Sequence, residues 1–226
     1  MCKYGKSLAH RGADVTIRPA LRGPRGRATR ATRARILEAA RQELGRDPDS
    51  SLGDIAEAAG VARRTVYSHF AGRAALIEGL VEDASATLRS TIADAALRDP
   101  DAATALARFF LILWPVADRY RMLLRLAAPD LPHEQVNGVL APARDMVTDI
   151  LSRGRRQGVF STPVPPAALS RALEAHHLAL LERVNAGIWT DDGTRAATAA
   201  LIAAGVDPDL AATRVHSLSA TLGTPN

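Results

Sequence analysis

The chain has 226 residues, of which 47% are hydrophobic and 23% are charged, and its formal net charge is +5. This composition supports a sizeable core, while the absence of any apolar run near the roughly 20 residues that span a bilayer excludes a transmembrane helix. The single cysteine, Cys2, excludes an internal disulfide. We therefore expect a cytoplasmic protein that does not enter a membrane.

The positive charge is concentrated at the N-terminal end. Residues 1–73 hold 15 of the 29 Lys and Arg residues but only 7 of the 24 Asp and Glu residues, so the remainder is mildly acidic. This asymmetry indicates a polyanionic partner for the first part of the chain only. A basic tail that merely aids solubility is the alternative.

The composition and the periodicity predict an all-α fold of about nine helices. Alanine is abundant, Val, Ile, Tyr and Phe are scarce, and apolar residues recur at helical spacing. Residues 1–28 mix Gly, Pro and Arg without a period and are expected to form a flexible arginine-rich arm. Pro115 is expected to end a helix and Pro142 to kink one. The expected helices span residues 31–47, 51–60, 61–70, 73–98, 101–114, 116–128, 133–158, 165–187 and 191–205, and residues 206–226 are expected to be a C-terminal tail.

Two consecutive short helices form a helix-turn-helix pattern. The first has Ser51 as a plausible N-cap with Asp54 three residues later, which is a weak capping-box pattern, and Gly60 ends it. The second follows after a turn of about three residues. Such a pair is typical of proteins that bind the major groove of DNA.

The second short helix presents a cationic face. In helical geometry Val66 and Phe70 face the core, whereas Arg64 and Tyr67 point roughly the other way. A helix this short is not stable alone in water, so neighbours must hold it. A major groove about 12 Å wide admits one helix, and Arg63 and Arg64 at its start are suited to bidentate contacts with guanine O6 and N7.

The stretch "SLGDIAEAAGVARRTVYSHFAGRAALIEGL" resembles the DNA-binding signature of the TetR family of transcriptional regulators. The match covers about 45 residues, from roughly Thr32 to Ile77, and combines an apolar stripe, "AAGV", and "VYxHF" followed by a basic residue. The resemblance implies a helix-turn-helix DNA-binding domain over residues 29–76. A larger helical domain over residues 77–205 is expected to bind an effector and to dimerise.

The resemblance implies a ligand-responsive regulator, a repressor, that binds a palindromic operator in double-stranded DNA as a homodimer and is released by a small-molecule effector. It implies no enzymatic activity, no cofactor and no metal. In the family the tyrosine that matches Tyr67 contacts phosphate, and Arg73 stands where a lysine usually holds the DNA backbone. The expected DNA-binding residues are Ser51, Arg63, Arg64, Thr65, Tyr67, Ser68, His69 and Arg73.

The larger domain carries candidate ligand-binding and dimerisation surfaces. Aromatic residues gather in the segments 101–114 and 116–128, which suits a mostly apolar ligand cavity, although such a stripe is also typical of plain core. The leucines of residues 165–187 and the alanines of residues 191–205 are expected to form a four-helix dimer interface, unless they pack within one subunit. The expected ligand-binding residues are Phe110, Trp114, Tyr120, Arg121 and His177.

Two other classes of function remain as alternatives. A protein-interaction module would keep the fold without specific DNA binding, and its binding would lack a steep salt dependence. An enzyme is disfavoured because no complete phosphate-loop, zinc or nucleophile-elbow motif is present. The arginine-rich arm is expected either to track phosphates or a minor groove, or to have no particular role.

Overall fold

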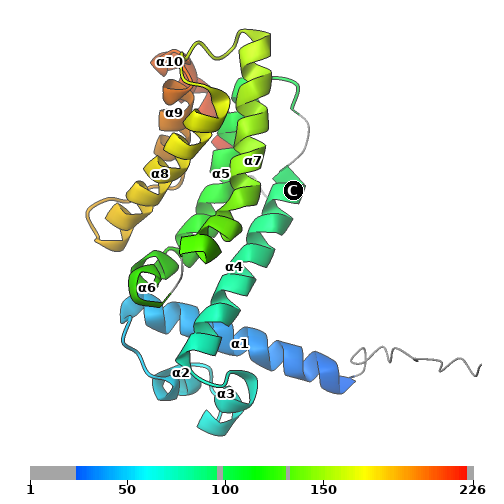
Figure 1. Ribbon diagram of the computed structural model, residues 1–226, viewed down its shortest axis with the longest axis vertical. Coiled ribbons are helices and arrows are strands. Elements are labelled where there is room, and N and C mark those ends of the chain that lie inside the picture. Colours follow the sequence, from blue (N-terminus) through cyan, green and yellow to red (C-terminus); the bar gives the residue numbers. More distant parts are fainter. Residues whose placement is uncertain (1–23, 96–98, 131–132, 223–226) are drawn as a thin grey trace, which may run out of the picture.

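The computed structural model describes residues 24–95, 99–130 and 133–222, and these residues form ten α-helices and no strands. The all-α prediction is therefore confirmed. Figure 1 shows a small unit of α1, α2 and α3 at one end of an elongated molecule, with α4 running from this unit into a larger helical body. The helices are α1 (Pro24–Arg46), α2 (Leu52–Ala58), α3 (Arg63–His69), α4 (Arg73–Ala95), α5 (Ala102–Tyr120), α6 (Met122–Asp130), α7 (His133–Gln157), α8 (Pro166–Asn185), α9 (Thr194–Ala203) and α10 (Pro208–Leu222).

The small unit has a hydrophobic core of its own, to which α4 and α6 contribute. Val66 and Phe70 from α3 are buried in it, as the helical spacing predicts. Gly60 takes a φ of 61° in the turn between α2 and α3, a conformation that L side chains rarely adopt. The other buried members are Ile36, Leu37, Ala39, Ala40, Leu44, Ile55, Ala56, Ala59, Leu76, Leu80, Met122 and Leu126.

The larger body is organised around α5. Leu106 and Ala107 are fully buried, and α9 packs closely on α5 because its facing residues, Ala197 and Ala200, are small and fully buried. Ala196, Ala197 and Ala200 of α9 are therefore used inside the subunit, which differs from the dimer interface expected for residues 191–205, whereas Ala203 is exposed. Their small side chains permit close packing against α5 within one chain.

Two boundaries, the start of α1 and the end of α5, differ from the sequence expectations. The arginine-rich arm was expected over residues 1–28, but α1 already begins at Pro24, and residues 1–23 lie outside the described part. Pro115 does not end α5, which continues to Tyr120. Trp114 and Tyr120, on either side of this proline, are both buried, and their packing offsets the lost backbone hydrogen bond.

The C-terminal tail expected over residues 206–226 is instead largely the helix α10. The Asp207 carboxylate accepts hydrogen bonds from the backbone N–H groups of Asp209 and Leu210, at 3.0 and 3.1 Å, and so caps the first turn. Ala211 and Val215, one turn apart, are buried. The tenth helix thus adds to the expected nine.

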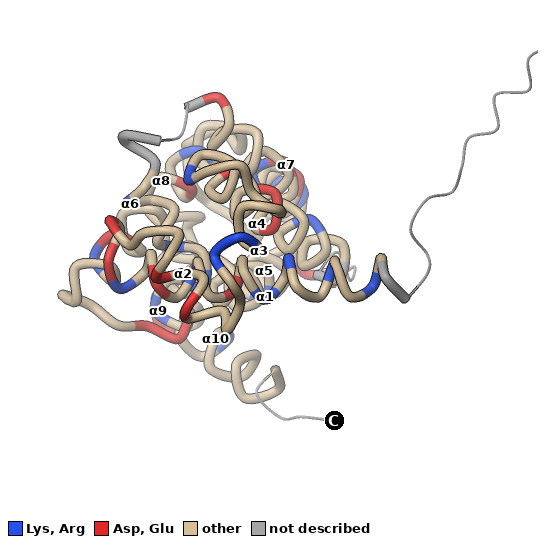
Figure 2. Tube along the Cα trace, turned by 90° about the horizontal axis from the view of Figure 1, so that it is seen from below, with Lys and Arg blue, Asp and Glu red and all other residues tan. Residues whose placement is uncertain are grey.

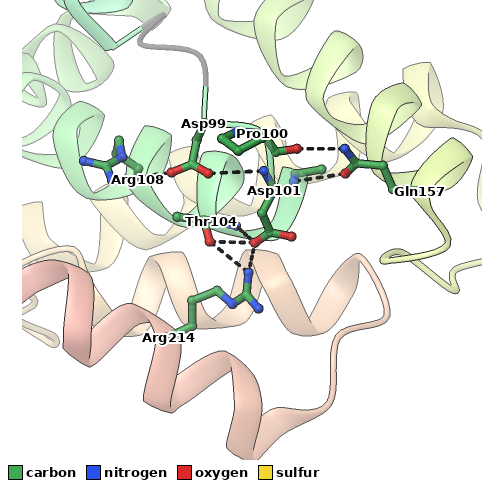
Figure 3. A network of polar contacts seen from close by, with 8 residues as sticks. Asp99, Pro100, Asp101, Thr104, Arg108, Gln157 and Arg214 are labelled. Carbon is green, nitrogen blue, oxygen red and sulfur yellow. Dashed lines mark hydrogen bonds and ion pairs between the residues drawn. The ribbon is translucent and has the colours of Figure 1, made fainter.

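A polar junction attaches α10 to the start of α5 (Figure 3). Asp101 is the N-cap of α5, and its Oδ2 accepts hydrogen bonds from the Thr104 backbone N–H at 2.9 Å and the Thr104 hydroxyl at 2.6 Å. The Arg214 guanidinium of α10 pairs with the same carboxylate and donates to the Thr104 hydroxyl at 2.9 Å. Gln157 of α7 accepts from the Ala102 backbone N–H at 3.1 Å. One carboxylate therefore joins two helices far apart in the sequence.

We expect Asp101→Ala to lower the free energy of unfolding by about 1–2 kcal/mol, mostly through the lost helix cap. The Arg214 pair is partly exposed and contributes at most about 1 kcal/mol. Urea denaturation of this variant beside Arg214→Ala, which keeps the cap, measures the two contributions. Equal stability of Asp101→Ala and the unmodified protein would contradict the assignment.

Candidate nucleic-acid interface and ligand cavity

The helix α3 presents polar side chains away from the core of the small unit. Val66 is fully buried, whereas Arg63, Arg64 and Ser68 are exposed and the Tyr67 side chain is 57% exposed. Figure 2 views this end of the molecule and shows Lys and Arg positions at the start of α3 and along α1. The arrangement suits a negatively charged partner, because the cationic groups lie outside while the apolar side is braced.

The two arginines at the start of α3 differ in their surroundings. The Arg63 guanidinium lies across α2, so closely that a β-carbon at Gly53 would stand 2.7 Å from its Nη2 atom. Arg63 also contributes, after the hydrogen bonds from Ser51, to holding the pKa of Asp54 below its usual range. Arg64 is exposed on the polar side of α3.

Ser51 is part of a complete capping box at the start of α2. Its Oγ accepts hydrogen bonds from the backbone N–H groups of Gly53 and Asp54, both at 3.2 Å. The Asp54 carboxylate accepts from the Ser51 backbone N–H and hydroxyl, both at 2.8 Å, and the hydroxyl bond is the largest cause of its lowered pKa. The weak capping-box pattern is thus present in full. The hydroxyl expected to contact phosphate already has these partners.

The capping and DNA-contact roles of Ser51 are separated by two substitutions. Ser51→Ala removes the cap, and we expect it to lower the free energy of unfolding by about 1 kcal/mol, whereas Ser51→Gly costs only a few tenths of a kcal/mol. Both remove the hydroxyl. If the hydroxyl also binds a phosphate, both variants lose DNA affinity equally; if it only caps, Ser51→Gly binds DNA like the unmodified protein. Thermal unfolding and fluorescence anisotropy with a DNA duplex measure the two effects.

Arg73, expected to hold the DNA backbone, is half-buried and bonded to protein groups. Its guanidinium donates to the backbone carbonyl oxygens of Ser50, at 3.1 Å, and Pro48. These bonds fasten the start of α4 to the loop between α1 and α2. The arginine therefore positions the helix-turn-helix against α4 through two of its donors.

The other expected DNA-binding residues lie on or beside the polar side of α3. The Ser68 hydroxyl donates to the Thr65 backbone carbonyl at 2.7 Å, which uses its proton within the helix. His69 is half-buried, with its ring tilted against that of Phe70. Local side-chain bonds of this kind were not visible in the residue pattern, because any Ser in a helix has the same choice of partners.

The larger body contains an apolar cavity with two adjoining lobes of about 140 and 80 Å³. Tyr120 and Arg121 line the first lobe, and Phe110, Trp114 and His177 line the second. All five expected ligand-binding residues therefore meet this cavity. The two lobes adjoin, because six residues line both of them: Leu113, Ala117, Leu140, Ala143, Leu178 and Leu181.

Much of the cavity wall was not expected from the sequence. Val81, Ala84 and Leu88 of α4 line the first lobe, and the half-buried pair of Arg144 and Glu174 lines the second. The guanidinium of Arg144 donates to the Glu174 carboxylate at 2.8 and 3.0 Å. The aliphatic residues follow the same helical spacing as ordinary core residues, so no sequence signal marks them as a wall.

Two titratable residues of the cavity are held in their neutral forms. His177 stacks on Phe110 with ring centroids 4.0 Å apart, and burial lowers its pKa to about 4. Tyr120 donates its hydroxyl hydrogen to the Asp83 carboxylate at 2.6 Å, and burial followed by this bond raises its pKa. At neutral pH both residues are therefore uncharged.

The helical fold and the exposed cationic face of α3 define a helix-turn-helix protein of the type that binds DNA and carries a second, larger helical domain. Residues 36–80 match the family model for bacterial regulatory proteins of the tetR family. The chain thus carries the DNA-binding segment and the fold of the TetR-family transcription regulators, and the resemblance noted in the sequence is confirmed. No curated protein sequence matches the chain.

Solved structures with the same fold include a TetR family transcription regulator from Marinobacter aquaeolei VT8, at 20% identity over 81% of this chain and 96% of that one, with a TM-score of 0.57. A gamma-butyrolactone receptor, described as an ArpA-like protein, is 22% identical over 79% of this chain and 98% of that one, with a TM-score of 0.58. NalD, the secondary repressor of the MexAB-OprM multidrug efflux pump in Pseudomonas aeruginosa, is 22% identical over 78% and 96%, with a TM-score of 0.55. At these identities the similarity concerns the fold.

Within the described ranges, no helix combines the length and the apolar character needed to cross a bilayer. The same part of the chain holds no group of three or more His, Cys, Asp or Glu side chains placed to bind a metal ion.

Proposed function

We propose that this protein is a repressor that binds a palindromic operator as a homodimer and is released when a small molecule enters the cavity of its larger domain. The observation that carries the proposal is the position of α6, which takes part both in the small unit of α1, α2 and α3, here called the reading unit, and in the cavity. Met122 and Leu126 belong to the core of the small unit, whereas Leu123 and Leu124 line the first lobe. A ligand that displaces α6 thereby displaces the unit that carries α3.

Polar contacts reinforce this connection between α1 and the junction of α5 and α6. Arg125 donates to the Gly45 carbonyl oxygen at 3.3 Å, and Arg119 pairs with Glu38 at 2.9 Å. Apolar packing and polar contacts thus both connect the reading unit to the end of α5 and to α6. A ligand lowers DNA affinity only by the amount by which it prefers the conformation that does not fit DNA.

We place the DNA contacts on α3, with Arg64 and Arg63 toward base edges and Tyr67 and His69 toward phosphates. Thr65, Ser68, Ser51 and Arg73 complete the proposed interface, the last two also holding the unit together. Exposure of Arg64 and Tyr67 beside a braced apolar face supports this role.

The proposed dimer forms through α8 and α10. Four exposed alanines follow one another at helical spacing along α8, and small side chains allow two helices to approach closely. Leu210 of α10 is 64% exposed and offers an apolar side chain to the proposed interface. The alanines are Ala168, Ala172, Ala175 and Ala179.

The similar structures include a receptor for a small molecule and a repressor, which agrees with the proposed pairing of ligand and DNA binding. The test is selection of bound duplexes from random DNA, followed by titration of the selected operator at several salt concentrations. We expect a palindromic sequence and a log–log salt slope of about −0.9 per contacted phosphate. Binding without sequence preference, or without salt dependence, would contradict the proposal.

A further inference from the structure

Three polar side-chain atoms within the described ranges are buried without a hydrogen-bond partner, and two of them belong to residues that line the cavity. These are Nε2 of His177, a residue that lines the second lobe, and Nε of Arg121, a residue that lines the first lobe. Buried polar groups in folded proteins nearly always have partners, and a missing partner costs free energy. Both atoms are therefore candidates for contact with a bound molecule.

The partner of the other His177 nitrogen determines what Nε2 can do. Nδ1 lies 2.8 Å from the Leu173 carbonyl oxygen, which only accepts hydrogen bonds, so Nδ1 carries the proton. In a neutral imidazole Nε2 then has a lone pair and no hydrogen. It accepts one hydrogen bond and offers none.

The surroundings of His177 disfavour a charged partner. The ring is stacked on Phe110 and stands edge-on to Trp114, with centroids 4.0 and 6.4 Å apart. The nearby Arg144 and Glu174 neutralise each other through two hydrogen bonds. A carboxylate beside Nε2 would need a second proton on the ring and would bury an ion pair, which costs desolvation energy. His176 is on the exposed side of α8, and Asp191 adds only a minor effect on the ring.

We infer that the effector is an uncharged, largely apolar molecule with a hydroxyl group that donates a hydrogen bond to His177 Nε2. This inference rests on the proposed function, because it assigns the cavity to the effector. The aromatic side chains of the second lobe favour a ring at the hydroxyl end, and the aliphatic walls of the first lobe favour an apolar tail. Arg121 Nε, a donor, supplies a contact for an acceptor atom on that tail.

The test uses three matched probes, para-hexylphenol, its methyl ether and para-hexylbenzoate, titrated into the full-length protein without DNA by isothermal calorimetry. The phenol donates a hydrogen bond, the ether cannot, and the benzoate is an anion. We expect the phenol to bind about tenfold more tightly than either of the others, as one buried hydrogen bond provides. Equal affinities, tighter binding of the benzoate, or no binding of any probe would overturn the inference.

His177→Phe keeps a ring on Phe110 but removes the acceptor, and His177→Gln restores an acceptor. We expect His177→Phe to bind the phenol and the ether equally, with the affinity for the ether unchanged, and His177→Gln to regain part of the preference. A preference for the phenol that persists in His177→Phe would assign the hydroxyl to another group and overturn the inference. Because these titrations contain no DNA, a failure of operator binding would overturn the proposed function alone.

Discussion

Arg64→Ala is expected to weaken binding to the preferred operator by about 1–3 kcal/mol, or roughly 5- to 150-fold, and to relax the preference at one base position. The reason is that a bidentate arginine contact to guanine discriminates against the other bases at that position. Arg64 is exposed on α3, whereas Arg63 is packed over Gly53. Fluorescence anisotropy with the selected operator and with single-base variants of it measures both effects.

The matched control is Arg89→Ala, which removes the same charge from an exposed position on α4 in the larger body. We expect this variant to bind the operator within about twofold of the unmodified protein, because the charge lies outside the reading unit. If Arg64→Ala weakens all base variants equally, Arg64 contacts phosphate instead of a base. If both substitutions have the same small effect, α3 is not the reading helix.

Gly193→Ala is expected to lower the free energy of unfolding by about 2–6 kcal/mol. Gly193 has a φ of 100°, and a β-carbon there would lie 2.8 Å from Cβ of Trp114. Left-handed backbone strain costs about 1–3 kcal/mol and overpacking a further 1–3 kcal/mol. Cβ of Trp114 belongs to the rigid base of a buried side chain, so it cannot swing away.

The control for Gly193→Ala is Gly187→Ala, at the other end of the same loop. Gly187 also has a positive φ, of 69°, but nothing lies within 4 Å of a β-carbon at that position. We expect a loss of only about 1–2 kcal/mol there, from backbone strain alone. Thermal and urea unfolding of the two variants separate the cost of backbone strain from the cost of the contact with Trp114. Equal losses would show that the Trp114 contact costs nothing.

The reading unit was largely predictable from sequence because its determinants are local. The capping box needs only Ser51 and Asp54, and the burial of Val66 and Phe70 follows from their spacing in one helix. The bonds of Arg73 to loop carbonyls and the placement of Arg63 over α2 were not predictable. Both depend on how segments that are distant or separated by a turn come together.

The larger body was less predictable, because its cavity and packing depend on contacts between helices that are distant in the sequence. The five residues expected to bind a ligand all line the cavity, but the walls from α4 and α7 follow the ordinary helical period of core residues. The helix α10 carries a local signal, an Asp207 cap and the buried pair Ala211 and Val215, that the interpretation as a tail overlooked. From the sequence alone, the α9 alanines suit packing within a subunit and between subunits equally well, and only the position of α5 in the structure distinguishes the two.

The continuity of α4 has a mechanical consequence. Its 23 residues correspond to a rod of about 35 Å that begins in the reading unit and passes along the cavity wall. If a helix of that length tilts by about 5° about one end, its other end moves by about 3 Å. In the proposed symmetric dimer the two α4 helices would tilt in opposite directions, so the relative displacement of their ends would double. In the proposed dimer, a bound effector that tilts both α4 helices would therefore change the separation of the two α3 helices.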